Sequence, residues 1–323
     1  MRKQGEQLGF ADHVVDQSVA RKKRRDSLSE VQALVDWARL EVLLAPLASP
    51  IGRPGYGVLT LFKALLLQAW YGLSDPGLED ALGDRVSFRR FVGLSWDEGT
   101  PDHSVISRFR SDLVRHGLDR LVFAAVSGQL EARGLIVKQG TLIDASLIRS
   151  AAGAPPVSAA DGGRVSPVDP DARWAKKGNK ATFGYKLHVA VDGDSGLVRA
   201  AEVTSANVND CVLGPALVQG DEAMVYADKA YDNAAMRERL ARDGIGNGVM
   251  TRANKHHPVL PPEASRRNRA LASVRCRVEK VFGTLKRSYR LDRMRFRGLA
   301  RNAGWMRLAL IALNLRRMHV LLT

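Results

Sequence analysis

Cysteine is scarce in this sequence, and its scarcity excludes two kinds of small stabilised domain. The 323 residues contain two cysteines, Cys211 and Cys276. A disulfide framework needs several cysteine pairs, and a structural zinc site needs closely spaced Cys and His ligands. Two distant cysteines supply neither. The chain is nevertheless long enough to bury a large core and to form two domains.

Long hydrophobic runs are missing as well. Lys63 and Arg307 interrupt the longest apolar stretches, which stay shorter than the roughly 20 residues that a transmembrane helix needs. No secretory signal peptide precedes them. We therefore expect no membrane partner and a cytoplasmic location.

Acidic residues are outnumbered by basic ones. The chain has 34 Asp and Glu against 49 Lys and Arg, which gives a net charge of +15. An excess of this size repels itself and is typical of a protein that binds a polyanion. The excess is concentrated in residues 264–323, where sixteen Lys and Arg face two acids, a local charge of +14. A nucleic acid is therefore the expected partner, and DNA would hold the protein at the nucleoid.

The first part of the chain is predicted to be helical. Residues 1–26 are polar and end in a basic run, which either stays solvated or contacts DNA backbone. In residues 27–134, Ser27 and Glu30 form a capping box for a first helix, whose apolar positions recur at helical spacing as far as Val42. Further helices are expected over residues 58–71, from Asp75 at an N-cap position, from Asp102, and over residues 118–133. Residues 58–71 are apolar nearly all round, which places that helix at the centre.

The helices that begin at Asp75 and Asp102 could form a helix-turn-helix with the turn at residues 100–102. The second helix would then face DNA with a group of polar side chains near its N-terminus: His103, Ser104, Ser107, Arg108 and Ser111. An ordinary helical bundle uses the same turn chemistry, so both interpretations stay open.

Residues 135–323 change to the alternating pattern of strands. We expect a strand in LIVKQGTLIDASLI, a hairpin formed by GYKLHVAVD and GLVRAAEVTS, and then helices alternating with strands, ending in one long helix through Glu279 and basic C-terminal helices. This order predicts an α/β fold, a mixed sheet flanked by helices, behind an all-α domain. Residues 151–182 are too long for an ordinary connection and are either a functional flap or disordered.

Three carboxylates stand where they could converge. Asp144 ends the apolar run GTLIDASLI and Asp228 ends AMVYADKAY, so both are predicted at strand tips. Glu279 shares a helical face with Arg275 and Lys286, beside an apolar stripe formed by Leu271, Val274, Val278 and Leu285. Carboxylate oxygens suit Mg²⁺, and cations beside them suit a phosphate. Taken singly, each acid is also an ordinary turn, cap or helix residue.

The ordered motifs resemble the ribonuclease-H-like catalytic core of bacterial DDE transposases, in particular the insertion sequence five family. They cover nearly the whole chain: WYGLSDPGLEDAL, TPDHSVISRFR, GTLIDAS, KKGNKATFGYKLHVAVDGDSGLV, ADKAYD and RCRVEKVFGTLKR. The family signature around the last acid is Tyr, two residues, Arg, three residues, Glu, six residues, Lys. Arg275, Glu279 and Lys286 fit that spacing, whereas Ala272 stands at the tyrosine position.

The resemblance implies a metal-dependent DNA endonuclease and strand transferase. Asp144, Asp228 and Glu279 would form its catalytic triad and hold two Mg²⁺ ions, with Mn²⁺ as a possible substitute, about 4 Å apart. The substrate would be double-stranded DNA, both the terminal inverted repeats of the element and the target DNA. Joining two ends implies a homodimer or a larger synaptic assembly. The alternatives are a catalytically silent repressor derived from a transposase and a structure-selective Mg²⁺-dependent nuclease.

Other side chains are candidates for DNA contact. Arg275 and Lys286 are candidate phosphate ligands. The segment before the hairpin could stack a base and hold its backbone, or could be a solvated charged loop with a tucked Trp; it contains Trp174, Lys176, Lys177 and Lys180. A basic run is expected to make affinity fall with salt, through Arg293, Arg295 and Arg297. His188 is interpreted as a core histidine, and Tyr231 either follows the family pattern or only packs.

Overall fold

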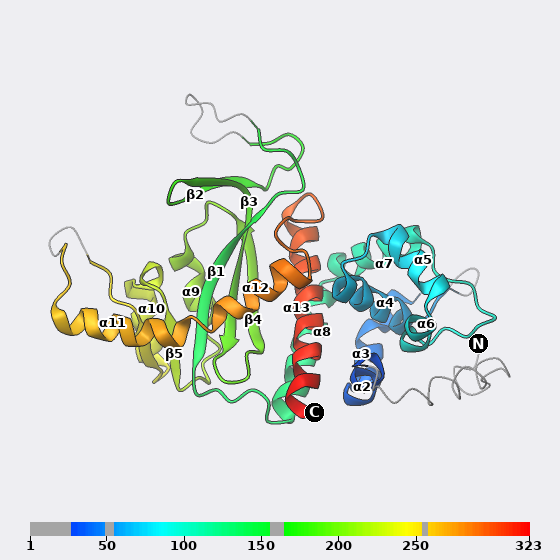
Figure 1. The fold of residues 1–323 in the computed structure, drawn as a ribbon, viewed down its shortest axis with the longest axis horizontal. Helices are drawn as coiled ribbons and strands as arrows, with labels where there is room; N and C mark the ends of the chain where they lie inside the picture. The colour runs from blue at the N-terminus through cyan, green and yellow to red at the C-terminus, as the bar shows by residue number, and fades with distance from the viewer. Residues whose placement is uncertain (1–26, 49–54, 156–164, 254–257) are drawn as a thin grey trace. The chain divides into compact units, whose positions relative to one another are not determined.

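The computed structural model describes residues 27–48, 55–155, 165–253 and 258–323, so the predicted basic tail lies outside the described residues (Figure 1). Contacts between Cα atoms divide the chain into two compact units. The first unit comprises the chain up to Ala125 together with the two C-terminal residues, Leu322–Thr323. The second unit comprises Val126–Leu321. Within the described ranges, no helix is long and apolar enough to cross a membrane.

The first unit is built from helices packed around α4 (Val58–Tyr71), which the sequence placed correctly at the centre. All of residues 61–70 are buried. Gly72 ends the helix in the left-handed conformation, with φ of 61°, which glycine adopts without strain. The other helices of this unit are α2 (Ser27–Leu34), α3 (Trp37–Leu44), the 3₁₀ turn η1 (Ala45–Leu47), α5 (Asp75–Asp84), α6 (Val86–Val92), α7 (His103–Arg115) and the start of α8 (Leu118–Ala132).

Two details of the predicted helices are wrong. The helix expected from Ser27 to Val42 is interrupted, because the Asp36 carboxylate accepts a hydrogen bond from the amide of Arg39 and starts α3 as a separate helix. Val42 is consequently 73% exposed. Asp75 is not a cap either: Ser74 caps α5, and the Asp75 carboxylate pairs with Arg110 at 2.6 Å.

The region predicted as a helix-turn-helix contains an additional helix. α7 begins after the cap Asp102, as expected. However, α6 lies between α5 and α7 and follows α5 after Arg85 alone. α5 and α7 pack against each other, but they are not consecutive helices as the predicted helix-turn-helix requires. α6 was not predicted, because its seven residues are too few to establish helical periodicity.

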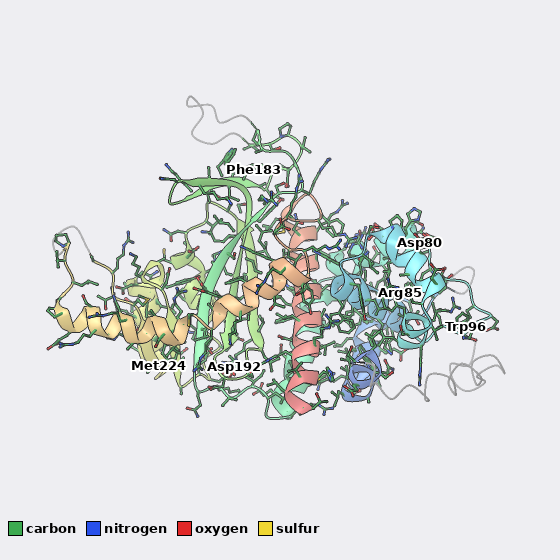
Figure 2. The ribbon with its side chains drawn as sticks, viewed as in Figure 1. Asp80, Arg85, Trp96, Phe183, Asp192 and Met224 are labelled. Atoms are coloured by element: carbon green, nitrogen blue, oxygen red, sulfur yellow. The ribbon has the colours of Figure 1, made fainter. Side chains whose placement is uncertain are left out.

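The second unit contains a six-stranded mixed sheet, which confirms the predicted fold class. The strands are β1 (Thr141–Arg149), β2 (Arg173–Lys177), β3 (Lys180–Asp192), β4 (Val198–Ser205), β5 (Met224–Ala227) and β6 (Gly246–Val249). Their order is β2-β3-β1-β5-β6, with β4 paired to β3. β1 pairs antiparallel with β3 and parallel with β5, and β5 pairs parallel with β6. Figure 2 shows Phe183 and Asp192 toward opposite ends of β3.

Helices flank this sheet. They are α9 (Asp210–Leu217), the 3₁₀ turn η2 (Lys229–Tyr231), α10 (Ala234–Arg242), α11 (Pro262–Arg275), α12 (Val278–Ser288) and α13 (Leu299–Leu322). One apolar cluster joins Ile143 and Val225 of the sheet to Leu217 of α9 and Met236 of α10. On α13, the amide group of Asn314 is bonded to both the N–H and the carbonyl of Val198. α13 is thus buried along much of its length.

The long segment before β3 is partly ordered sheet, which corrects the expectation of a flap or disorder for part of it. Residues 156–164 lie outside the described residues, but β2 pairs with β3 from Arg173↔Gly184 to Lys177↔Lys180. Asp169 anchors the approach to β2, because its buried carboxylate accepts hydrogen bonds from the Tyr185 hydroxyl and the amide of Gly298.

The helix predicted to run through Glu279 is also two helices. α11 ends at Arg275 and α12 begins at Val278. Between them, the amide of Glu279 bonds to the carbonyl of Cys276 three residues earlier, in 3₁₀ fashion. α11 has no fully buried residue, and Leu271 and Val274 are half-buried, whereas α12 buries Val278, Val281, Phe282 and Leu285.

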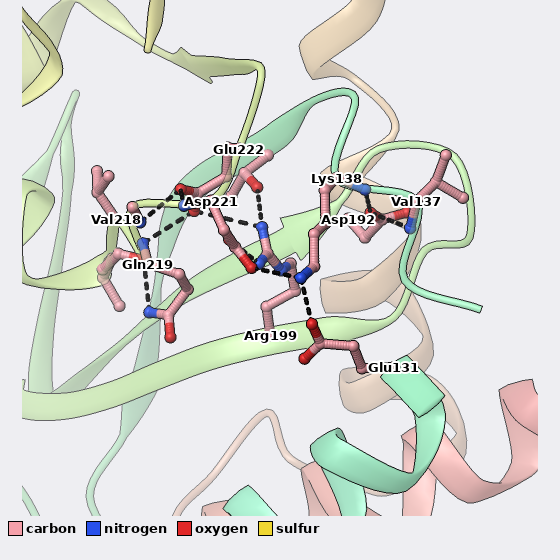
Figure 3. Close-up of polar contacts among 12 residues, drawn as sticks. Glu131, Val137, Lys138, Asp192, Arg199, Val218, Gln219, Asp221 and Glu222 are labelled. Carbon is pink, nitrogen blue, oxygen red and sulfur yellow. Dashed lines mark hydrogen bonds and ion pairs between the residues drawn. The ribbon is translucent and has the colours of Figure 1, made fainter. Parts of the chain in front are cut away.

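A polar network closes the end of the sheet at which β1 begins (Figure 3). Arg199, whose side chain is 5% exposed, pairs with Asp221 and Glu222. Lys138 pairs with Asp221 at 2.7 Å and also with Glu131. Every acid drawn in this network thus faces a cation or backbone N–H groups, so the network holds the loops at this end together.

Candidate active site

The parallel register of β1 and β5 brings Asp144 and Asp228 together. The last paired residues are Ile143 and Ala227, and each aspartate is the next residue of its chain. Asp228 follows β5, as the strand-tip prediction requires. Asp144 does not stand at a strand tip, because β1 continues beyond it in antiparallel pairing with β3, where Asp144 faces Val189. The two carboxyl-bearing residues therefore meet where β5 ends.

Alternation along β1 directs Asp144 toward the C-terminal helices. Ile143 belongs to the core shared with α9 and α10, and successive residues of a strand point to opposite faces. Asp144 consequently faces the other side, where Arg275 of α11 contacts it. The Asp144 Oδ1 atom accepts a hydrogen bond from the amide of Ala145, and Oδ2 accepts one from Arg275 Nη1, both at 2.9 Å.

Asp228 has a second, structural task as the cap of η2. Its Oδ1 atom accepts a hydrogen bond from the amide of Ala230 at 2.8 Å. Over the described ranges no hydrogen bond to Oδ2 is recorded. The ordinary cap interpretation of this residue is therefore correct, and it leaves one carboxylate oxygen for a ligand.

Glu279 does not join the two aspartates in this structure. It is an exposed residue of the first turn of α12, a helix that packs against β1. Among the described residues, no three His, Cys, Asp or Glu side chains are placed to hold one metal ion. Lys286, the third residue of the expected shared face, is partly exposed in the last turn of α12.

Tyr231 belongs to the buried apolar cluster of the sheet and lies within the electrostatic influence of the two aspartates. Its ring is fully buried, and a Cβ added at Gly214 would lie 2.9 Å from the ring atom Cδ1, so α9 needs a glycine there. Burial raises the pKa of the Tyr231 hydroxyl, and the charges of Asp210, Asp144 and Asp228 raise that pKa further. The hydroxyl has no hydrogen-bond partner within the described part of the chain. It stays protonated in a region of negative potential.

Sequence reasoning overlooked a polar group on the α9 side of the sheet. Lys186 Nζ pairs with Asp210 at 2.6 Å and also bonds to the carbonyl of Val208. His188, two residues along β3, is fully buried as the core interpretation predicted, and its Nε2 lies 3.0 Å from Thr204 Oγ1. Burial lowers the pKa of His188 to about 4. The available signal was the spacing of Lys186 and His188, which puts both on one face of a strand.

The carboxylate oxygens of Asp144 and Asp228 suit a divalent cation. Two adjacent carboxylates offer the hard oxygen ligands that Mg²⁺ and Mn²⁺ prefer. Arg275 engages one of these oxygens, and its guanidinium is also a partner for phosphate. Two carboxylates fit one ion, and Glu279 on the neighbouring helix is the further acid that a two-ion site would need.

The predicted base-stacking segment forms a hairpin instead of a loop. Trp174 lies on β2 and packs against Phe183, with ring centroids 5.6 Å apart, as the tucked-Trp alternative predicts. Lys176 and Lys180 are exposed on the same hairpin. The side chain of Lys177 lies outside the described residues. Base stacking by Trp174 stays a prediction.

The three arginines of the basic run have different surroundings. Arg293 donates to the carbonyls of Ser150 and Ala151 at 2.9 and 2.7 Å. The Arg295 guanidinium lies 4.9 Å from the ring centroid of Trp305. Arg297 is exposed. The run is therefore partly structural, and Arg297 is exposed with no hydrogen bond or ring contact recorded for it in the described residues.

The candidate DNA-facing residues of α7 lie near its N-terminus. His103 and Ser104 are exposed, and His103 Nδ1 lies 3.0 Å from Glu79 of α5. Arg108 is exposed one turn further and donates to the Ser104 hydroxyl at 3.4 Å. Ser107 is partly buried and accepts a hydrogen bond from Arg110, so it has an internal partner.

Two protein families match this chain. The transposase DDE domain matches residues 136–315, more than half of the chain, from before β1 into α13. The transposase domain DUF772 matches residues 16–112, which end within α7. Together with the mixed sheet and its flanking helices, the first match identifies a ribonuclease-H-like core.

Proposed function

We propose that this chain, which belongs to the DDE transposase family, is the transposase of an insertion sequence. It binds the terminal inverted repeats of its element, cuts at the element ends and joins them to target DNA. The motif order supports membership of the insertion sequence five family. The observation that carries the proposal is the register that places Asp144 beside Asp228 at the end of β5. Family members are, in general, metal-dependent enzymes that cut and transfer DNA strands.

The acids would hold the catalytic ions. Asp144 and Asp228 supply adjacent carboxylate oxygens. Glu279 lies directly after the joint between α11 and α12, so a change at this joint would bring its carboxylate to the two aspartates. When bound, Mg²⁺ or Mn²⁺ stabilises the charge that develops during in-line displacement and activates the attacking oxygen. Arg275 and Lys286 orient the scissile phosphate. The same site can then use the freed 3′-hydroxyl to attack target DNA.

Charge outside the acids supports DNA as the substrate. The exposed cations Lys176, Lys180 and Arg297 belong to the unit that carries the acids, and His103, Ser104 and Arg108 mark a second candidate contact on α7. We assign phosphate contacts to the cations and end recognition to α7. Because two ends must be joined, the active assembly is a homodimer or larger.

The test is cleavage and strand transfer on DNA that carries the sequences flanking the coding region. We expect Mg²⁺-dependent cutting at the ends and a joined product. Asp144→Asn and Asp228→Asn should each lower the rate by about a thousandfold or more, because each removes a metal ligand. Asp194→Asn, in the exposed turn between β3 and β4, is the matched control and should cut at the wild-type rate.

The products separate the alternatives. Binding to the ends without any cutting in Mg²⁺ or Mn²⁺ would identify a silent repressor. Cut DNA without a joined species would identify a nuclease. Wild-type cutting by Asp144→Asn or Asp228→Asn would overturn the assignment of that residue.

A further inference from the structure

Arg275 occupies an oxygen of Asp144 that a metal ion would use. The Nη1–Oδ2 distance is 2.9 Å, and the two side chains are 20% and 19% exposed. Solvent screens such a half-buried pair less than a surface pair. A guanidinium and a divalent ion repel each other, so they cannot share this oxygen without a large loss of attraction. Binding of either cation at this oxygen therefore weakens binding of the other.

The guanidinium of Arg275 has capacity left for a second anion. Its Nε atom is buried, with no hydrogen-bond partner within the described residues. Arginine binds carboxylate and phosphate through the same planar set of N–H groups. A phosphate that enters beside Asp144 is therefore a chemically equivalent partner for this side chain.

The position of Arg275 in the chain couples it to Glu279. Arg275 is the last residue of α11, Glu279 lies in the first turn of α12, and Cys276 and Arg277 form the joint between them. The amides of Glu279 and Lys280 bond to carbonyls three residues earlier, at 3.1 and 3.2 Å. A 3₁₀ stretch between two helices is a common place for a hinge. A change at this joint that brings Glu279 to the aspartates also moves Arg275.

We propose that Arg275 is a positioning residue that makes metal binding by Asp144 depend on DNA. Arg275 competes with the divalent ion for Oδ2 of Asp144. A DNA phosphate draws the guanidinium away, which removes this competitor from Oδ2 and releases the joint so that Glu279 approaches Asp144 and Asp228. This order of events rests on the proposed function. It delays metal loading until the DNA is in place.

The first test measures Mn²⁺ affinity of the full chain without DNA, by calorimetry. Arg275→Gln removes the competing charge and should bind Mn²⁺ about three- to tenfold more tightly than wild type. Arg277→Gln is the matched control: Arg277 lies in the same joint but is 55% exposed and faces Asp194 at 3.9 Å. It should bind as wild type does. Adding Asp144→Asn to Arg275→Gln should remove the gain.

The second test adds a short duplex that carries an element end. Wild-type affinity for Mn²⁺ should rise several-fold on DNA binding, and that rise should be much smaller in Arg275→Gln. Arg275→Lys, which keeps the charge but not the planar donors, should restore part of the difference. Thermal melting checks that each variant folds. If Arg275→Gln does not fold, the wild-type rise with DNA and the Lys variant still decide the matter.

The inference fails if Arg275→Gln binds Mn²⁺ no more tightly than wild type, or if DNA leaves the wild-type affinity unchanged. Either result can occur while the wild type still cuts element ends in Mg²⁺, and the proposed function would then stand. Absence of any cutting by the wild type would instead remove the proposed function.

Discussion

The sheet of the second unit has acidic residues at both ends, and their surroundings differ. Where β1 begins, the Glu222 carboxylate accepts hydrogen bonds from the amides of Gln219, Gly220 and Asp221 and pairs with Arg199. Where β5 ends, Asp228 accepts one recorded hydrogen bond, from the amide of Ala230. The first end uses nearly all of its carboxylate oxygens internally (Figure 3). At the second end, Oδ2 of Asp228 accepts no hydrogen bond from the described residues and is available to a ligand.

This difference separates acids that stabilise the fold from acids that serve chemistry. A buried carboxylate that is fully hydrogen-bonded has no further ligand to gain, and removing it leaves its donors unsatisfied. A carboxylate with one committed oxygen costs the fold less and can bind a cation. Two neutral groups are also left without a hydrogen-bond partner among the described residues. They are the buried hydroxyl of Tyr231 and the buried Nδ1 of His188.

The largest effect on stability is expected at the closed end. Glu222→Gln replaces an acceptor oxygen by an NH₂ group that faces backbone N–H donors, and it leaves Arg199 less compensated. We expect a loss of about 3 kcal/mol in the free energy of unfolding, measured by urea denaturation. Asp228→Asn keeps an oxygen for the amide of Ala230 and should cost less than about 1 kcal/mol. Equal losses in the two variants would end the distinction between the two ends.

The next effect concerns pH and the buried histidine on the α9 side of the sheet. The pKa of His188 falls from 6.5 to about 4 on folding because burial disfavours the charged ring. The unfolded chain therefore binds more protons between these pH values, so stability is lost as pH falls from about 6.5 to 4. The loss should be on the order of 2–3 kcal/mol. His188→Gln should flatten this part of the stability profile, and an unchanged profile would show that other groups cause it.

Local patterns in the sequence predicted much of the fold. The bounds of α4, 58–71, follow from periodicity and turn residues, and the structure has the same bounds. The joint at Cys276 and Arg277 could not be foreseen, because neither residue is a helix breaker and the sequence around them keeps helical composition. β2 was not predicted, because it lies in a segment rich in Ala, Gly, Pro and Asp.

The site depends on contacts between residues distant in sequence. Both aspartates were found from the apolar runs before them, but their adjacency depends on the parallel register of β1 and β5, which no local pattern specifies. The contact of Arg275 with Asp144 joins residues 131 positions apart. Spacing alone placed Arg275 beside Glu279 and could not show that a carboxylate of β1 would bind it.

The smallest effect concerns cations, to which the same distinction applies. Arg293 directs its guanidinium at the carbonyls of Ser150 and Ala151, whereas Arg297 is exposed and no partner is recorded for it in the described ranges. Arg297→Gln should make the slope of log affinity against log salt shallower by about 0.9, which corresponds to the loss of one phosphate contact. The melting temperature should stay unchanged. Arg293→Gln should lower the melting temperature, because the part-buried carbonyl of Ser150 loses its donor. A salt titration and a melting curve for each variant decide the point. If Arg297→Gln gives the wild-type slope, this arginine only solubilises the protein, and the DNA backbone must be held by Lys176 and Lys180 of the β2–β3 hairpin or by other cations.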